Sequence, residues 1–157
     1  MKVIGIDLAT EKGKTGLCVL NKKTRTYILK TDKEIIEIIR TIKPDIITID
    51  SPLSLPKKGL RKAEKDLLKL SIKVFPPLMP SMKKLAQRAI KLKRQLKNYK
   101  VIEVYPHAAR KILKTKTKKS HRNDAKLCAL VGKLYLEKKT KAIGNRKEGQ
   151  IIIPKWK

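Results

Sequence analysis

Four acidic residues occupy positions where strands and helices rarely carry an acid, and they are the residues best able to do chemistry. Asp7 stands inside an alternating, strand-like segment, and Asp50 ends a short apolar run. Glu103 is enclosed by Ile102 and Val104, and Asp124 falls on the apolar stripe of a long helix. Because an unpaired buried carboxylate is costly and Asp is disfavoured in strands, these positions indicate a function.

The chemistry that such acids predict is metal binding. If the strands that carry Asp7 and Asp50 are parallel neighbours, the two side chains lie side by side, and a helix packed over them adds Asp124. Clustered carboxylates stay ionised when a cation joins them, and Mg²⁺ or Mn²⁺ suits an all-oxygen cluster. A pair of such ions activates water and stabilises the leaving oxygen of a phosphodiester. His121 precedes Asp124 by three residues and shares its helix face.

Each acid also has a simpler explanation, which the sequence leaves open. Asp7 would cap the following turn, and Asp50 would begin an Asx turn. Asp124 would favour the positive end of its helix, and Glu103 would pair with a lysine on a half-exposed strand. The occurrence of all four in one very basic chain favours a common site.

The charge of the chain predicts a polyanionic partner. Its 157 residues include 41 Lys and Arg against 13 Asp and Glu, which gives a net charge of +28. Nucleic acid is the expected partner, with an anionic membrane surface as the weaker alternative. Only 4% of residues are aromatic, so we expect contacts to the phosphate backbone rather than base-stacking platforms. A basic segment is the expected rim for those contacts: Lys114, Lys116, Lys118 and Lys119.

The elements that must position these residues follow from periodicity and from capping signals. Alternating or apolar segments predict strands over Lys2–Ala9, Thr15–Leu20, Thr24–Leu29, Asp45–Asp50 and Lys100–Tyr105. Helical stripes and caps predict helices over about 31–43, 60–70, 81–98, 107–113 and 120–138. Residues 11–14 are expected to turn, and residues 142–154 to form a small terminal hairpin that turns at 145–149.

This order predicts one α/β domain over residues 1–157. Three strands joined by short turns and then alternating strands and helices imply a mixed five-stranded sheet, antiparallel first and then parallel, flanked by helices. The C-terminal hairpin is expected to stand beside it. Without a signal peptide, a membrane span or paired cysteines, the chain is expected in the reducing cytoplasm, with Cys18 and Cys128 as core residues.

Several strings of the sequence are similar to a known family. They are Gly5-Ile6-Asp7-Leu8-Ala9, Asp50-Ser51-Pro52-Leu53 with Pro56 and Gly59, Arg61 with Glu64, Glu103-Val104-Tyr105-Pro106-His107-Ala108, and His121-x-x-Asp124-Ala125. Nearly end to end, the chain resembles the uncharacterised prokaryotic family of predicted nucleases with an RNase H fold. The pattern also resembles RuvC-type Holliday-junction resolvases. In those enzymes two metals are held by an Asp of the first strand, by an acid that ends the fourth strand after a Pro-Asp start, and by a final Asp with a His or Asp three residues before it.

The resemblance implies an RNase H-like fold and a metal-dependent endonuclease. It assigns Asp7, Asp50 and Asp124 as ligands of two Mg²⁺ or Mn²⁺ ions, and His121 as a fourth ligand or a proton-transfer group. Glu103 departs from the resolvase site and would complete the metal shell or position His107.

Three further residues have weaker assignments. His107 is a weak candidate for binding phosphate or a metal ion. Arg61 and Glu64 lie one helical turn apart, so Arg61 would bind phosphate while held by Glu64, or the two would form a surface ion pair, which is the favoured interpretation.

The leading prediction is therefore a nuclease that hydrolyses phosphodiester bonds in DNA or RNA, including structured or branched substrates. The alternative is a non-catalytic nucleic-acid-binding module of the same fold. A phosphotransferase of the sugar-kinase and actin type would need two such domains, and a structural nucleic-acid-binding protein would leave the acids unexplained. A monomer and a homodimer both stay open, and a junction-cutting enzyme would need the dimer.

Overall fold

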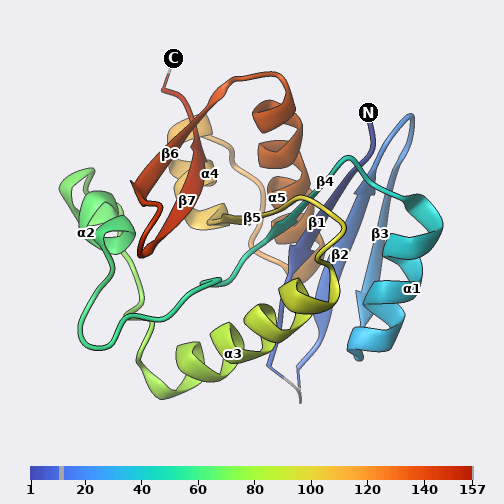
Figure 1. Ribbon diagram of the computed structural model, residues 1–157. Coiled ribbons are helices and arrows are strands. Elements are labelled where there is room, and N and C mark those ends of the chain that lie inside the picture. The colour runs from blue at the N-terminus through green and yellow to red at the C-terminus, as the bar shows by residue number, and fades with distance from the viewer. Residues whose placement is uncertain (11–12, 157) are drawn as a thin grey trace.

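A single mixed sheet runs through the protein, as the computed structural model shows for residues 1–10 and 13–156 (Figure 1). Its strand order is β3-β2-β1-β4-β5-β7-β6. The strands are β1 Val3–Asp7, β2 Thr15–Leu20, β3 Thr24–Leu29, β4 Ile46–Ile49, β5 Val101–Val104, β6 Thr140–Asn145 and β7 Gly149–Pro154. The helices are α1 Asp32–Ile42, α2 Lys62–Lys69, α3 Pro80–Gln95, α4 Pro106–Leu113 and α5 His121–Leu136. Glu11 and Lys12 of the predicted turn lie outside the described residues.

The predicted arrangement of antiparallel and then parallel strands is confirmed. β1 pairs antiparallel with β2 and parallel with β4, and β4 pairs parallel with β5. The C-terminal hairpin does not stand apart, because β7 pairs in parallel with β5 and so extends the sheet from five strands to seven. This pairing covers the otherwise open edge of β5 and buries Ile151 and Ile153 against α2 and α4. β5 and β7 are far apart in the sequence, so no local pattern predicts that they pair.

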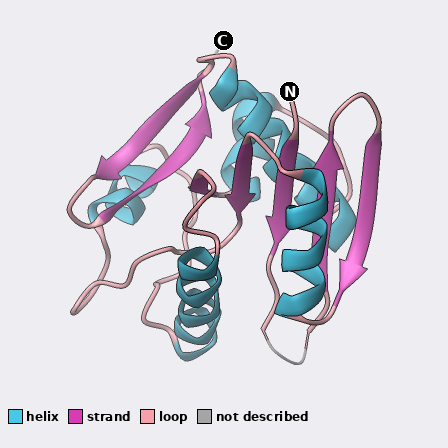
Figure 2. Ribbon diagram, turned by 45° about the vertical axis from the view of Figure 1, so that its right-hand side comes forward, coloured by secondary structure: helices cyan, strands magenta, loops and turns pink. Residues whose placement is uncertain are grey.

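The helices cover the two faces of the sheet in separate groups (Figures 1 and 2). Ile4 and Ile6 of β1 face α1 and α3 in the largest apolar cluster. Val3 lies on the opposite face, in a smaller cluster with residues of α5. The alternation of side chains along β1 therefore sends Asp7, like Val3, toward α5. Among the described residues, no helix has the length and apolar character needed to cross a membrane.

Local signals explain where the first helix begins and ends. The Thr31 side chain accepts a hydrogen bond from the Glu34 backbone N–H, and the Glu34 carboxylate accepts one from the Thr31 N–H. This is the predicted capping box, which satisfies two backbone donors at the start of α1. Lys43 ends α1 in the left-handed conformation, directly before Pro44. α1 is further joined to α3 by Arg88, whose Nε donates to Asp32 at 2.9 Å.

Glycines let the backbone of α5 lie directly against the sheet. A Cβ atom at Gly5 would stand 2.3 Å from the Ala129 nitrogen and 2.4 Å from the Ala125 oxygen. A Cβ atom at Gly16 would stand 2.2 Å from the His121 oxygen. Real Cβ atoms do not approach backbone this closely, so only glycine allows this depth of packing. The contact fixes the first turns of α5 beside the ends of β1 and β2.

We expect Gly5→Ala to destabilise the protein by about 3 kcal/mol or more, because the added methyl collides with backbone atoms and forces α5 away from β1. Urea unfolding of the variant measures the loss. The matched control is Gly59→Ala, where no atom beyond the adjacent residues lies within 4 Å and the only penalty is the left-handed backbone, about 1–2 kcal/mol. An equal loss in both variants would contradict the close-packing explanation.

Candidate metal centre

Two of the predicted acids lie side by side because of the β1–β4 register. Asp7 is the last residue of β1, and Asp50 follows the last residue of β4. Ile6 pairs with Ile49 in parallel, and the Asp50 N–H donates to the Ile6 carbonyl at 2.9 Å. The next residues along the two strands, Asp7 and Asp50, therefore leave the sheet at the same edge.

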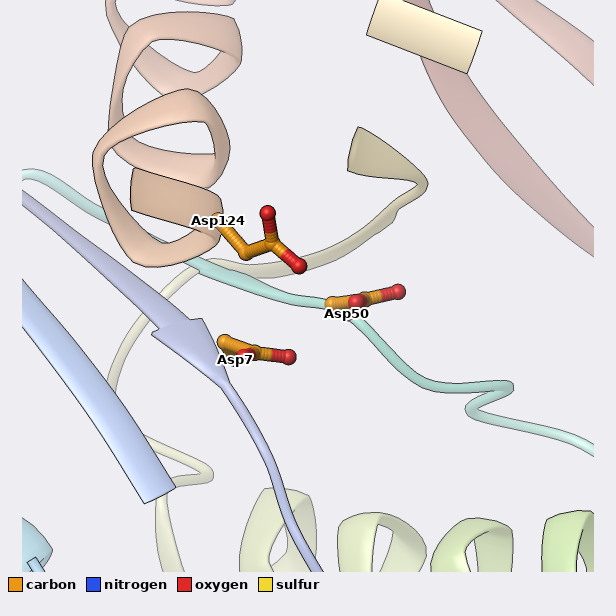
Figure 3. A group of neighbouring side chains, drawn as sticks. All are labelled: Asp7, Asp50 and Asp124. Carbon is orange, nitrogen blue, oxygen red and sulfur yellow. The ribbon is translucent and has the colours of Figure 1, made fainter. Parts of the chain in front are cut away.

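The first turn of α5 brings the third acid to the same place. Ser120 caps this helix, and its hydroxyl accepts a hydrogen bond from the Asn123 N–H at 3.1 Å. Asp124 is buried as part of the inward face of α5, as its spacing predicted. One carboxylate oxygen from each of Asp7, Asp50 and Asp124 lies within 4.8 Å of the others, and the three side chains point toward one space (Figure 3).

The electrostatics of this cluster favour a cation. Burial raises the pKa of Asp50 well above its ordinary value, and the negative charges of Asp7 and Asp124 raise it further. Burial also raises the pKa of Asp7, while a hydrogen bond from His121 opposes the shift. An all-oxygen set of three carboxylates fits the preferences of Mg²⁺ and Mn²⁺. A divalent ion would relieve the repulsion that these pKa shifts record.

Two basic side chains contact the cluster. His121 Nδ1 forms a hydrogen bond of 2.9 Å with Asp7 Oδ2, and 55% of its side chain is exposed. Arg110 of α4 pairs with Asp124, and its Nε is buried without a partner among the described residues. Sequence reasoning missed Arg110, because the packing of α4 against α5 brings it to Asp124 and no local pattern marks it.

Glu103 does not join this cluster and instead binds Arg61. Arg61 Nη1 and Nη2 donate to the two carboxylate oxygens of Glu103 at 2.9 and 2.7 Å, and its Nε donates to Glu64 at 2.8 Å. The Arg61 side chain is only 1% exposed. The predicted pairing of Arg61 with Glu64 is confirmed, but its placement at the surface is wrong, and the guanidinium is already occupied by two carboxylates. The spacing of Arg61 and Glu64 along the helix could not reveal the second partner of Arg61, which is Glu103 on β5.

The Arg61–Glu103 pair fixes the chain that leaves Asp50. The Leu53 N–H donates to Glu103 Oε2 at 3.1 Å, and Arg61 Nη1 donates to the Ser54 hydroxyl at 3.0 Å. Ser54 in turn donates to the Glu148 carbonyl at 2.5 Å, in the turn between β6 and β7. The segment between Asp50 and α2 is thus tied to β5 and to the terminal hairpin, and this limits where Asp50 can lie.

The carboxylate cluster opens into a cavity of about 510 Å³. Arg110, His107 and Lys119 also line it. His107 is exposed at the start of α4, with its ring 5.7 Å from that of Tyr105, and it has no contact with the three carboxylates that would make it part of the cluster. Four exposed lysines lie in the segment between α4 and α5, immediately before His121: Lys114, Lys116, Lys118 and Lys119.

The sheet order and the edge that carries the acids define an RNase H-like fold, which solved RuvC structures share. The chain is 17% identical to "T. thermophilus RuvC in complex with Holliday junction substrate", with a TM-score of 0.56, over 96% of this chain and 99% of that one. It is 18% identical to "Thermus thermophilus RuvC structure", with a TM-score of 0.51, over 88% of this chain and 96% of that one. The chain belongs to the family described as "Protein of unknown function (DUF429)", which matches residues 5–149. No curated protein matches it.

We expect Asp50→Asn to stabilise the protein in EDTA. A carboxyl with a raised pKa in the folded state costs stability as pH rises above its ordinary pKa, and an amide removes that cost. The expected gain is about 1 kcal/mol, or ~2–4 °C in Tm at neutral pH, and it shrinks at pH 4–5. Thermal unfolding between pH 4 and 8 measures it.

The same variant should lose the increase in Tm that Mg²⁺ or Mn²⁺ gives the wild type, because stabilisation by a ligand requires its site. Asp45→Asn is the control, since Asp45 is an exposed acid at the opposite end of β4. An Asp50→Asn protein that melts lower in EDTA and still responds to metal would contradict this account of the cluster.

We expect Arg61→Met to destabilise the protein by about 3–5 kcal/mol at neutral pH, because Glu103 and Glu64 are left buried without their cation. Burial already raises the pKa of Glu103, and Arg61 opposes that shift. The variant should therefore recover stability as pH falls toward 5 and Glu103 is protonated. Urea unfolding at pH 5 and 7 tests both points. Lys62→Met, which breaks a half-exposed pair with Asp66, should cost less than about 1 kcal/mol.

Proposed function

We propose that this protein is a metal-dependent nuclease that hydrolyses phosphodiester bonds in DNA or RNA. The observation that carries the proposal is the cluster of Asp7, Asp50 and Asp124, with oxygens within 4.8 Å of one another, in a chain of net charge +28. A protein that only bound nucleic acid would gain nothing from three carboxylates facing its ligand. The RuvC likeness supports the proposal, since one of those structures holds a Holliday junction.

In this proposal Asp7, Asp50 and Asp124 hold Mg²⁺ or Mn²⁺. When bound, the metal supplies an activated water and stabilises the leaving oxygen of the phosphodiester. His121 orients the Asp7 carboxylate through its Nδ1, and its half-exposed ring is able to carry a proton between the site and solvent. Arg110 pairs with the Asp124 carboxylate and so holds that side chain in place.

The basic surface would bring the substrate to these residues. The lysines between α4 and α5 are exposed and lie shortly before His121 in the sequence, and Lys119 lines the cavity. Contacts from such side chains to phosphates release counterions, so binding through them weakens steeply as salt rises. We propose Lys114, Lys116, Lys118 and Lys119 as this phosphate-contacting rim.

A cleavage assay tests the proposal. Labelled single-stranded DNA, duplex DNA, four-way junction, single-stranded RNA and RNA–DNA hybrid are incubated with Mg²⁺ or Mn²⁺. We expect cleavage of at least one substrate that requires the metal and falls by more than about 100-fold in Asp7→Asn, because one ligand of the cluster becomes neutral. Asp45→Asn, prepared in the same way, should cleave like the wild type.

Equal cleavage by Asp7→Asn, or cleavage in EDTA, would contradict the proposal and point to a contaminating enzyme. Binding of nucleic acid with no cleavage of any substrate would favour a non-catalytic binding module of the same fold.

A further inference from the structure

The cavity beside the carboxylate cluster is also lined by apolar side chains. Besides Asp7, Asp50 and Asp124, its lining includes Val74, Phe75, Met82, Leu85 and Tyr105. A metal and a phosphate would use only the acidic residues. A cavity that combines a few charged groups with apolar and aromatic lining is typical of sites that bind an organic group beside an ionic one.

Phe75 is the one exposed residue among these apolar lining residues. It is the only phenylalanine in the chain, and 48% of its surface is exposed. Few large hydrophobic side chains are exposed among the described residues: Met1, Leu68, Phe75, Met79 and Trp156. Of these five, only Phe75 lines the cavity. An exposed hydrophobic side chain is ordinary by itself, but an exposed ring that also lines the cavity beside the carboxylates offers a surface for a ligand.

The segment that carries Phe75 is fixed to the rest of the fold although it is neither helix nor strand. Phe75 lies between α2 and α3 and is followed by Pro76 and Pro77, which restrict the backbone to extended conformations. Lys73, two residues earlier, also lines the cavity, and its carbonyl accepts a hydrogen bond of 2.7 Å from the Tyr105 hydroxyl. This contact ties the segment to the residue that follows β5.

We infer that the cavity takes the base of an unpaired nucleotide, with the Phe75 ring stacked on the base while the neighbouring phosphate faces the carboxylate cluster. The inference rests on the proposed function and specifies its substrate: single-stranded nucleic acid, or an unpaired position in a structured one. A base inside a duplex is stacked on both faces and must leave the helix before it can enter such a cavity.

The positive charge of the chain favours a nucleotide over a peptide as the occupant. The chain carries +28, and Lys73 and Lys119 line the cavity together with the acidic cluster. Single-strand-binding proteins combine the same two features, basic groups for the backbone and an aromatic ring for the base. The low aromatic content argued against a stacking platform, but one ring is sufficient when it stands at the site.

The test measures binding by fluorescence anisotropy to three labelled probes of equal length in Ca²⁺, with probe integrity checked on a gel. The probes are a single-stranded oligonucleotide, an oligomer of abasic sugar-phosphate units, and a duplex. We expect Phe75→Ala to weaken binding of the single strand by about 5- to 100-fold and to leave the abasic oligomer and the duplex unchanged. Phe75→Tyr, which keeps a ring, should retain binding.

Leu68→Ala is the matched control, because Leu68 is 49% exposed and does not line the cavity. It should bind all three probes like the wild type. No effect of Phe75→Ala on the single strand, or an equal loss on the abasic oligomer, would overturn the inference, since the ring would then not contact a base. Failure to bind any of the probes would also overturn it and leave a peptide as the candidate occupant.

The two proposals fail in different ways. Ring-dependent binding of single strands without metal-dependent cleavage would support the base site and contradict hydrolysis. Asp7-dependent cleavage that proceeds as fast in Phe75→Ala as in the wild type would support hydrolysis and overturn the base site.

Discussion

The contact between α5 and the β1 strand governs the geometry of the rest of the site. α5 reaches the sheet closely because Gly5 has no side chain where the helix backbone passes. At that depth the first turn of α5 places Asp124 over the edge where Asp7 and Asp50 leave β1 and β4. A helix lifted by the width of one methyl group would carry Asp124 away from Asp7 and Asp50.

The site works against the stability of the fold that carries it. Three carboxylates held close together, two of them with raised pKa values, repel one another and lose hydration. Their arrangement persists because neighbouring parts of the structure are firmly fixed. The buried Arg61–Glu103 pair ties the chain after Asp50 to β5, and Arg110 supplies a positive charge to Asp124. Stability sacrificed at such a site is typical of a functional centre.

The charge of the protein acts in one way over the whole surface and in another within the cavity. Over the whole surface the excess of lysine attracts a polyanion, an effect that acts at long range and carries no sequence information. At the cluster of Asp7, Asp50 and Asp124 the sign reverses, and the cavity that holds this cluster is also lined by Phe75. A phosphate is repelled by these carboxylates unless a cation intervenes, so the proposed metal is also what would make the cavity accessible to the substrate that the surface attracts.

The sequence by itself determined the elements and the identity of the acids. The alternation of side chains along β1 placed Asp7 on the face of the strand that does not carry Ile6. Helical spacing placed Asp124 on the face of α5 that packs against the sheet, since both patterns depend on local backbone geometry. Only the tertiary structure decided which distant groups meet. Several features join segments that are separated along the chain. β7 pairs with β5, Arg61 is buried between Glu64 and Glu103, and Arg110 contacts Asp124. Phe75 likewise lines the same cavity as the distant carboxylates. Such pairings depend on packing of the whole sheet, and periodicity within one segment carries no record of them.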